Sequence, residues 1–384
     1  RDWSSDVCSS DLLREDGTVS ADAFCADVTV TMGALKLSLY SDAAKDVAGR
    51  IVCCELGVSR RLFEQANAVA GKALEDGIAP TFQTTAAGSG NAVATDSAAI
   101  AAAGVGGKQG AVAPAALLLD AGDNALPERR RGNVHKGTFG HVVVASGEKG
   151  GAACIAGTAA LRFGAGLVTL VQLDAARAPV QLSPELMTAT SLPEKTSAVA
   201  VGMGLGRAES AATPWLDWLC AHPDVPCVID ADACYARGLP ALLRARAAGV
   251  VLTPHPKEFQ ALLASCGLGA FSVADCVNLR PSLIADFCRA FPNVVLLVKG
   301  ANVMIGVNAG EGQRLFVNPL GTAALATAGS GDVLAGLIAA LLAQGRAPLD
   351  AACNASLAHA LASRAFTHSY ALSPLTLIEA VTTL

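Results

Sequence analysis

Near the end of the chain, apolar residues recur at the spacing of a helix directly after a run of small residues. The apolar positions are Val333, Leu334, Leu337, Ile338, Leu341 and Leu342. The small run before them, Ala328–Asp332, predicts a glycine-rich turn that opens a buried helix. Because the first N–H groups of a helix lack partners within it and the helix dipole is positive there, the turn predicts a phosphate site.

Asp332 lies where this turn becomes helix, and two interpretations of it stay open. An acidic residue there can cap the helix by accepting backbone hydrogen bonds. It can also take a proton from a hydroxyl group that lies beside a bound phosphate. The small residues that precede it favour the second interpretation, in which Gly329, Ser330 and Gly331 form the anion hole.

From residue 113 onward, short apolar segments alternate with helical patterns, which predicts an α/β domain with a mostly parallel sheet covered on both faces. The predicted strands are His141–Ala145, Leu167–Gln172, Ala198–Gly202, Pro226–Asp230, Val250–Thr253, Val294–Lys299, Val303–Val307 and Leu315–Val317. The predicted helices include Ala152–Phe163, Leu239–Ala247, Lys257–Leu263 and Asp275–Ala290, and the closing segment Leu349–Leu384 is expected to be helical with Asp350 as its N-cap.

The first part of the chain has a different character. Residues 1–12 have no periodicity and are interpreted as a non-native leader. Ala26–Met32 and Arg50–Gly57 are predicted strands, too few for a stable domain. Residues 71–112 are rich in Ala, Gly, Ser and Thr and are predicted to be a linker, with a helix at Ala98–Ala103 allowed by propensity alone.

Composition narrows the class of protein. The chain has 384 residues, of which 52% are hydrophobic and 16% charged, so it can bury a substantial core. A net charge of −5 gives no support for a nucleic-acid or membrane-surface partner. The 12 cysteines are scattered without zinc spacing, which is typical of buried thiols in a reducing compartment and favours a cytoplasmic enzyme.

Three further motifs follow predicted strands, where ligands gather in parallel sheets. Ser146–Ala153 opens a helix with small residues, which suits either a ligand or close helix–sheet packing. Gly202–Gly206 is interpreted as a close-approach loop and not as a dinucleotide fingerprint, because its third glycine comes one place early. In Asp230–Asp232, an Asp at the end of the strand can orient a ligand or hold Mg²⁺ through water. For Asp232, a cap of the following helix is an equally open interpretation.

Two motifs carry cationic or imidazole groups. His255 lies between two prolines that restrict its backbone, which favours a ligand contact over a solvated ring. Glu258 then caps the following helix or helps to place a metal. Lys299 follows another strand, where it either neutralises a phosphate or is a solvated side chain in a β-turn.

This ordered set of motifs resembles the ADP-dependent NAD(P)H-hydrate dehydratases of the ribokinase-like superfamily, over about Pro114–Leu384. The resemblance implies a three-layer α/β/α fold and an enzyme that restores NAD(P)H from its hydrate, using ADP and releasing AMP and phosphate. The positions that match contacts to the hydrated nicotinamide nucleotide are Ala152, Gly204, His255 and Asp332. The positions that match the AMP site are Lys299, Gly300, Ala301, Asn302, Val303 and Gly331.

The resemblance also implies a mechanism and a setting. Asp332 is expected to be the base that takes the proton of the substrate hydroxyl as its oxygen attacks the terminal phosphate of ADP. Mg²⁺ is expected to bridge the phosphates through waters, with no metal ligands assigned among the residues. Relatives of this kind often form tetramers, so a homo-oligomer is expected.

Residues 13–70 resemble the end of an NAD(P)H-hydrate epimerase domain, with Ala26–Lys36 as the matching run. The upstream binding motifs of that domain are not found, so no epimerase activity is expected of this chain. Residues 113–384 are then the dehydratase domain. Two alternatives stay open: an ATP-dependent kinase of small-molecule hydroxyls from the same superfamily, and a nucleotide-binding regulatory module without turnover.

Overall fold

The computed structural model describes residues 18–21, 23, 25–32, 35–54, 92–94, 116–130, 132–173, 183–246, 249–309 and 312–384. The chain divides into two compact units between Leu118 and Leu119. The expected leader, and the helix allowed at Ala98–Ala103, lie outside the described residues. The expected domain limits at residues 12, 70 and 112 stay predictions.

The first unit contains short strands. β1 (Val28–Met32) pairs in parallel with β3 (Arg50–Cys54), with Val30 opposite Val52. β2 (Leu35–Lys36) pairs in parallel with β4 (Ala92–Ala94), which pairs antiparallel with β5 (Ala116–Leu118). The two strands predicted from the sequence are therefore present as β1 and β3, although residues 55–57 lie outside the described part.

The second unit is built on nine strands in the order β14-β13-β12-β11-β10-β9-β6-β7-β8. Neighbouring strands are parallel except that β13 runs antiparallel to both β12 and β14. The bounds are β6 His141–Ala145, β7 Leu167–Val171, β8 Met187–Ala189, β9 Ala198–Val201, β10 Cys227–Ile229, β11 Val250–Leu252, β12 Val294–Val298, β13 Val303–Ala309 and β14 Gly312–Asn318. Strands β9 to β12 are buried at every position, as expected of strands covered on both faces.

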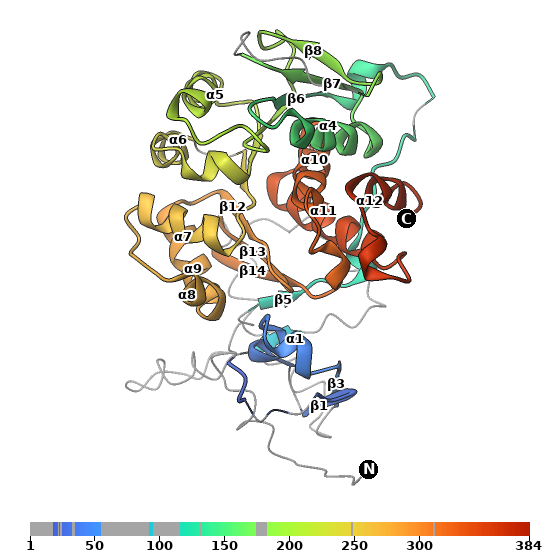
Figure 1. The fold of residues 1–384 in the computed structure, drawn as a ribbon, viewed down its shortest axis with the longest axis vertical. Coiled ribbons are helices and arrows are strands. Elements are labelled where there is room, and N and C mark those ends of the chain that lie inside the picture. The colour runs from blue at the N-terminus through green and yellow to red at the C-terminus, as the bar shows by residue number, and fades with distance from the viewer. Residues whose placement is uncertain are drawn as a thin grey trace, which may run out of the picture. The chain divides into compact units, whose positions relative to one another are not determined.

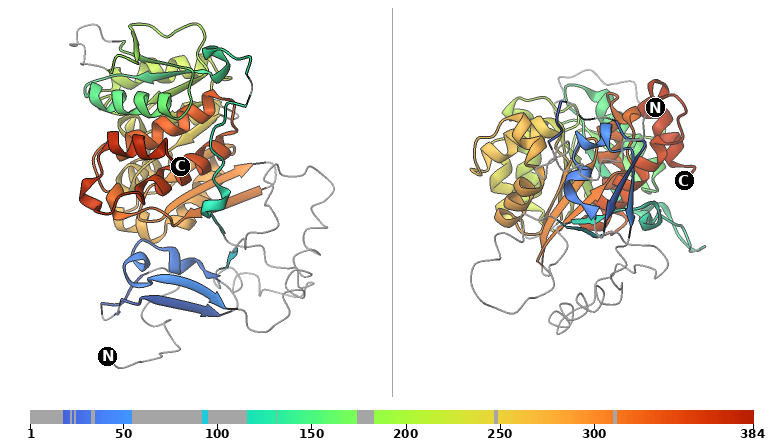
Figure 2. Two further views of the ribbon diagram at one scale, coloured as in Figure 1. Left: turned by 90° about the vertical axis from the view of Figure 1, so that its right-hand side faces the viewer. Right: turned by 90° about the horizontal axis from the view of Figure 1, so that it is seen from below.

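Helices cover both faces of this sheet (Figure 1). One layer holds α4 (Gly150–Arg162), α10 (Ser330–Ala343), α11 (Pro348–Ser363) and α12 (Pro374–Val381), and the left view of Figure 2 shows it in front of the strands. The other layer holds α5 (Glu209–Ala221), α6 (Leu239–Ala245), α7 (Pro256–Ser265), α8 (Val273–Asn278) and α9 (Arg280–Ala290). The predicted three-layer α/β/α architecture is thus confirmed.

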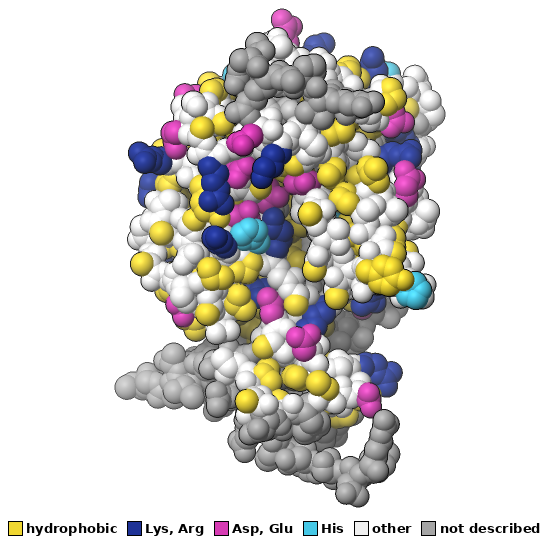
Figure 3. All heavy atoms as spheres, in the orientation of Figure 1, with side chains coloured by type: hydrophobic (Ala, Val, Ile, Leu, Met, Phe, Trp, Pro, Cys, Tyr) yellow, Lys and Arg dark blue, Asp and Glu magenta, His cyan; other side chains and the backbone are white. Residues whose placement is uncertain are grey.

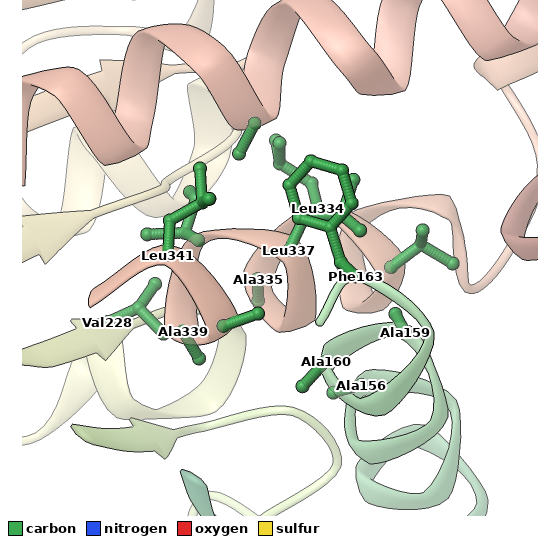
Figure 4. Close-up of a cluster of buried hydrophobic side chains, with 14 of the residues drawn as sticks. Ala156, Ala159, Ala160, Phe163, Val228, Leu334, Ala335, Leu337, Ala339 and Leu341 are labelled. Atoms are coloured by element: carbon green, nitrogen blue, oxygen red, sulfur yellow. The ribbon is translucent and has the colours of Figure 1, made fainter. Parts of the chain in front are cut away.

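Helix α10 is the centre of the core. All ten of its residues from Val333 to Leu342 are buried, and it packs against α4, α11 and the strands β9 and β10. Figure 4 shows Ala156, Ala159 and Ala160 of α4 on one side of α10, and Leu337 and Leu341 of α10 on its other side. The alanines of α4 let the two helices approach closely, because a Cβ added at Gly336 would lie 2.2 Å from the carbonyl oxygen of Ala156.

Two predicted features are wrong. Asp275–Ala290 is not one helix, because it divides at Leu279 into α8 and α9, with Pro281 in the first turn of α9. Proline has no N–H and its ring collides with the carbonyl group four residues earlier, so it cannot continue a helix begun at Val273. Asp350 is not an N-cap, since α11 begins after Ala347; its carboxylate instead bonds Arg346 and Asn354.

No helix in the described residues is long and apolar enough to cross a membrane.

The close approach of α10 and α4 predicts that Gly336→Ala destabilises the protein, although alanine is the better helix former. The added methyl group must push a backbone carbonyl away, which typically costs about 1–3 kcal/mol in a well-packed core. Gly151 of α4 is the matched control, because a Cβ there meets nothing within 4 Å. Denaturant unfolding should show a lower free energy of unfolding for Gly336→Ala and no decrease for Gly151→Ala. An equal free energy of unfolding in the two variants would contradict this packing.

Candidate active site

The loops that follow β6, β9, β10, β11 and β12 all leave the same edge of the sheet, because these strands are parallel. The amino end of α10 faces the same edge, since a Cβ at Gly331 would lie 3.4 Å from Nζ of Lys299 and 3.9 Å from Oδ2 of Asp230. Figure 3 shows Lys and Arg side chains gathered there around acidic side chains and a histidine. This edge is the candidate active site.

The turn at the start of α10 is fixed by its backbone. Gly329 is the N-cap, with φ of +89°, and a Cβ there would also lie 2.5 Å from Cγ of Pro374. Only glycine fits both constraints. Among the described residues no side chain caps α10, so the capping interpretation of Asp332 is wrong. The Ser330 N–H donates to the Thr327 carbonyl group at 3.2 Å, which leaves the neighbouring N–H groups of Gly329 and Gly331 for a ligand. The Ser330 hydroxyl donates to the Leu325 carbonyl group, so this turn offers an anion its backbone rather than that hydroxyl.

A buried histidine forms a hydrogen bond to this turn. Nε2 of His359, on α11, lies 2.9 Å from the carbonyl oxygen of Ser330. Burial lowers the pKa of His359 to about 4, so the ring is neutral and Nε2 carries the proton that it donates. Sequence reasoning missed this residue, because a single histidine in an alanine-rich helix carries no signal of its partner.

Lys299 is held by two carboxylates that come from neighbouring strand ends. Its Nζ lies 2.7 Å from Oδ1 of Asp230, which follows β10, and 3.8 Å from Oε2 of Glu258 in α7. Burial lowers the pKa of Lys299, but these two negative charges outweigh burial and the pKa is raised, so the ammonium keeps its charge. The solvated-lysine interpretation is therefore wrong.

His255 caps α7. Its Nδ1 accepts from the N–H groups of Lys257 and Glu258, at 3.1 Å and 3.2 Å. Nε2 must then carry the proton of the neutral ring, and it lies 3.1 Å from Oε1 of Glu258. Oε2 of Glu258 accepts from the His255 N–H at 2.8 Å, which confirms the predicted cap by Glu258. The imidazole orientation is thus set by its own helix, with 46% of the side chain exposed to a ligand.

Asp332 stands in the first turn of α10, half-buried beside this charged group. Burial raises the pKa of its carboxyl to about 7, and the charges of Asp230 and Glu258 add to the rise while Lys299 opposes it. A carboxyl group that titrates near neutral pH is suited to exchange protons with a substrate.

Two of the four substrate positions taken from the resemblance, Ala152 and Gly204, lie against each other. Gly204 has φ of +60°, and a Cβ there would lie 3.0 Å from Cβ of Ala152 and 2.4 Å from the carbonyl oxygen of Lys149. The Lys149 N–H donates to the Gly204 carbonyl at 2.7 Å. The loops after β6 and β9 are therefore packed backbone to backbone, and Gly329 adjoins them, since a Cβ there would lie 3.2 Å from Cδ1 of Ile155.

The turn from Lys299 to Val303 is anchored on one side and open on the other. Asn302 is buried, and its carbonyl oxygen accepts from Nη1 of Arg280 at 2.8 Å. Gly300 and Ala301 are exposed, and Val303 is half-buried. The turn therefore presents its backbone to solvent next to Lys299.

Backbone strain separates two carboxylates at the end of β10. Ala231 has φ of +47°, which side chains rarely adopt. Asp230 before it bonds Lys299, whereas Oδ2 of Asp232 accepts from the Gly206 N–H at 2.9 Å. The interpretation of Asp232 as a cap of the next helix is wrong. Among the described residues, no group of three or more His, Cys, Asp or Glu side chains is arranged to hold a metal.

A cavity of about 510 Å³ lies elsewhere on the second unit, lined by Asn124, Ala125, Leu126, Glu128, Arg130 and Arg346. Arg346 follows the carboxyl end of α10, opposite the end that carries Asp332. The converging charges therefore mark the site better than this cavity does.

Comparisons with known proteins show the family of this chain. A family model described as NAD(P)H-hydrate dehydratase matches residues 141–383. The bifunctional NAD(P)H-hydrate repair enzyme Nnr of Helicobacter pylori is 38% identical over 365 residues, which cover 95% of this chain and 65% of that protein. The ADP-dependent (S)-NAD(P)H-hydrate dehydratase of Neisseria meningitidis is 37% identical over 240 residues, or 60% of this chain and 78% of that protein.

A solved structure gives the same fold. The ADP/ATP-dependent NAD(P)H-hydrate dehydratase of Bacillus subtilis, co-crystallised with ATP/Mg²⁺, matches with a TM-score of 0.58 and 28% identity, over 67% of this chain and 92% of that one. The chain spans less than two thirds of the length of its Helicobacter relative. With the family model matched over most of its length, the chain belongs to the NAD(P)H-hydrate dehydratase family.

Proposed function

We propose that this chain dehydrates the S form of hydrated NAD(P)H to NAD(P)H, consuming ADP and releasing AMP and phosphate. The proposal rests mainly on the position of Asp332, whose half-buried carboxyl group lies in the first turn of the uncapped helix α10 and has its pKa raised to about 7. The helix start is suited to a transferred phosphoryl group, and the carboxylate to the proton of the attacking alcohol. The name of the Neisseria relative supports the choice of ADP and of the S hydrate.

The proposed reaction has two stages. Asp332 takes the proton of the C6 hydroxyl as its oxygen bonds the terminal phosphorus of ADP, and the bond from that phosphorus to the bridging oxygen breaks to release AMP. The ring nitrogen's electron pair then expels phosphate from C6, and loss of the C5 proton restores the dihydropyridine ring. The backbone N–H groups of Gly329 and Gly331 stabilise the charge on the moving phosphoryl group, whereas the predicted contribution of Ser330 is excluded because its N–H donates to the Thr327 carbonyl group.

The two substrates occupy the two halves of the edge. The hydrated nicotinamide lies against Ala152, Gly204, His255 and Asp332, and the close packing of Gly204 against Ala152 supports a shared surface for it. The adenosine phosphate of ADP lies along Lys299, Gly300, Ala301, Asn302 and Val303 and reaches Gly331. The short approach of Gly331 to Lys299 supports this path for the nucleotide.

Mg²⁺ fits this edge as an ion held mainly by phosphates and water. Of the Asp230 carboxylate, Oδ1 bonds Lys299 and Oδ2 faces Gly331, so Oδ2 would hold the ion through a water. When bound, Mg²⁺ neutralises phosphate charge. Assembly into a tetramer and a cytoplasmic location belong to the same proposal.

The decisive assay combines the purified chain, the S hydrate of NADH, Mg²⁺ and either ADP or ATP. Recovery of dihydronicotinamide absorbance together with AMP release supports the dehydratase. A stable phosphoester of the substrate would instead identify a small-molecule kinase, and nucleotide binding without turnover would identify a regulatory module.

Asp332→Asn should lower turnover by about a hundred- to ten-thousandfold, because the amide cannot accept the proton. In the unchanged protein, kcat/KM should rise with pH through about 7, as the carboxyl group of the free enzyme loses its proton. Asp286→Asn, which removes an exposed carboxylate of α9, is the control and should keep full turnover. Turnover of Asp332→Asn at the control's rate would remove Asp332 from the role of base.

The same carboxyl group predicts a pH-dependent stability. Between the unfolded pKa near 4 and the folded pKa of about 7, the folded protein retains a proton that the unfolded chain has released. The free energy of unfolding therefore falls as pH rises through this window, and the full penalty remains above it. Asp332→Asn should raise Tm at pH values above 7, with a gain that shrinks towards pH ~4. An equal gain in Tm above pH 7 and near pH ~4 would contradict the raised pKa of Asp332.

A further inference from the structure

An arginine that the proposed reaction does not use lies close in the chain to the residues proposed to bind the hydrated nicotinamide. Arg207 follows Gly206 in the loop after β9, three residues beyond Gly204. This loop is fixed on both sides. The Gly204 carbonyl accepts from the Lys149 N–H at 2.7 Å, and the Gly206 N–H donates to Oδ2 of Asp232 at 2.9 Å.

The guanidinium group of Arg207 is held in place without being buried. Its Cζ lies 3.8 Å from the centre of the Tyr235 ring, and its Nε lies 3.5 Å from Oδ1 of Asp232. Even so, 61% of the Arg207 side chain is exposed. Tyr235 and Asp232 belong to the same short 3-10 helix, Ala231–Tyr235, directly after β10. One structural element therefore supplies both the face on which the guanidinium stacks and the carboxylate that orients it.

This arrangement is not explained by stability. An exposed ion pair contributes little to folding, because water screens it and the side chains lose freedom. A guanidinium fixed at its Nε side, however, can still present its outer donors as a planar fork, and that fork matches the oxygens of a phosphate. A pre-ordered cation loses less entropy when an anion binds than a free side chain does.

We propose that Arg207 binds a phosphate group of the nicotinamide nucleotide, with Tyr235 and Asp232 as the residues that position it. This inference rests on the proposed function, which places the nicotinamide ring of the same molecule against Gly204 and Ala152. The phosphate is either the diphosphate bridge, which NADH and NADPH share, or the 2′-phosphate, which only NADPH carries.

The test compares Arg207→Gln and Arg207→Lys with the unchanged protein, using the hydrates of NADH and NADPH at saturating ADP. KM for the hydrate should rise roughly ten- to a hundredfold in Arg207→Gln, as is usual when a hydrogen bond to a charged group is lost, while kcat and the KM for ADP stay unchanged. Arg207→Lys keeps the positive charge but not the planar fork of donors. Its KM for the hydrate should therefore lie between those of the unchanged protein and Arg207→Gln. A rise for both hydrates assigns the diphosphate, and a rise for the NADPH hydrate alone assigns the 2′-phosphate.

Arg289→Gln is the matched control, because Arg289 is 66% exposed and also pairs with one carboxylate, that of Asp286 on α9. Its KM values should equal those of the unchanged protein. A second readout, equilibrium binding of the products NADH and NADPH followed by their fluorescence, does not depend on turnover. Loss of this binding in Arg207→Gln supports the role of Arg207 even if the chain does not turn over the hydrate, in which case only the proposed function fails. Unchanged KM and unchanged product binding, or a rise in the KM for ADP alone, would overturn the inference.

Discussion

The complete burial of α10 is the constraint from which the site follows. Helix α10 is apolar and has alanine and glycine on the side that faces α4. It can therefore lie in the middle of its layer, with other parts of the protein packed around it. Its amino end meets the carboxyl ends of the central strands, where the carboxylates of Asp230 and Glu258 are buried away from water. Because charges interact more strongly where water is scarce, the uncapped N–H groups act on an anion there more strongly than they would at a surface helix.

The same burial governs how the charges around this helix start affect one another. Two carboxylates, Asp230 and Glu258, flank a single ammonium, that of Lys299, so the group carries an excess of negative charge before any ligand binds. That excess, together with burial, raises the pKa of Asp332. A phosphate placed beside Asp332 would raise this pKa further, since like charges oppose ionisation. A cation that accompanies the phosphate therefore does more than hold it, because it also keeps Asp332 able to accept a proton.

The sequence predicted the parts of this arrangement that depend on local pattern. The strands were found because short apolar runs end at small or polar residues, and the glycine-rich turn because Gly329 and Gly331 precede an apolar helix. Partners that are distant in the chain could not be found in this way. The pairing of Lys299 with Asp230 spans 69 residues, and the bond from His359 to Ser330 spans 29. The divided helix at Leu279 was missed although Pro281 signals it, because the apolar pattern continues across the break.

The strained residue Ala231 shows how one strand end can direct two carboxylates to different loops. With an ordinary backbone there, successive side chains would leave β10 on a regular course. The left-handed conformation instead turns Asp230 towards Lys299, and Asp232 towards Gly206. Strain of this kind costs about 1–3 kcal/mol and persists only where the surrounding structure holds it. Here the close fit of Gly202 against the Asp230 carbonyl group holds it, since a Cβ at Gly202 would lie 1.8 Å from that oxygen. The positions of Asp230 and Asp232 relative to each other are therefore set by packed backbone, which moves less than side chains do.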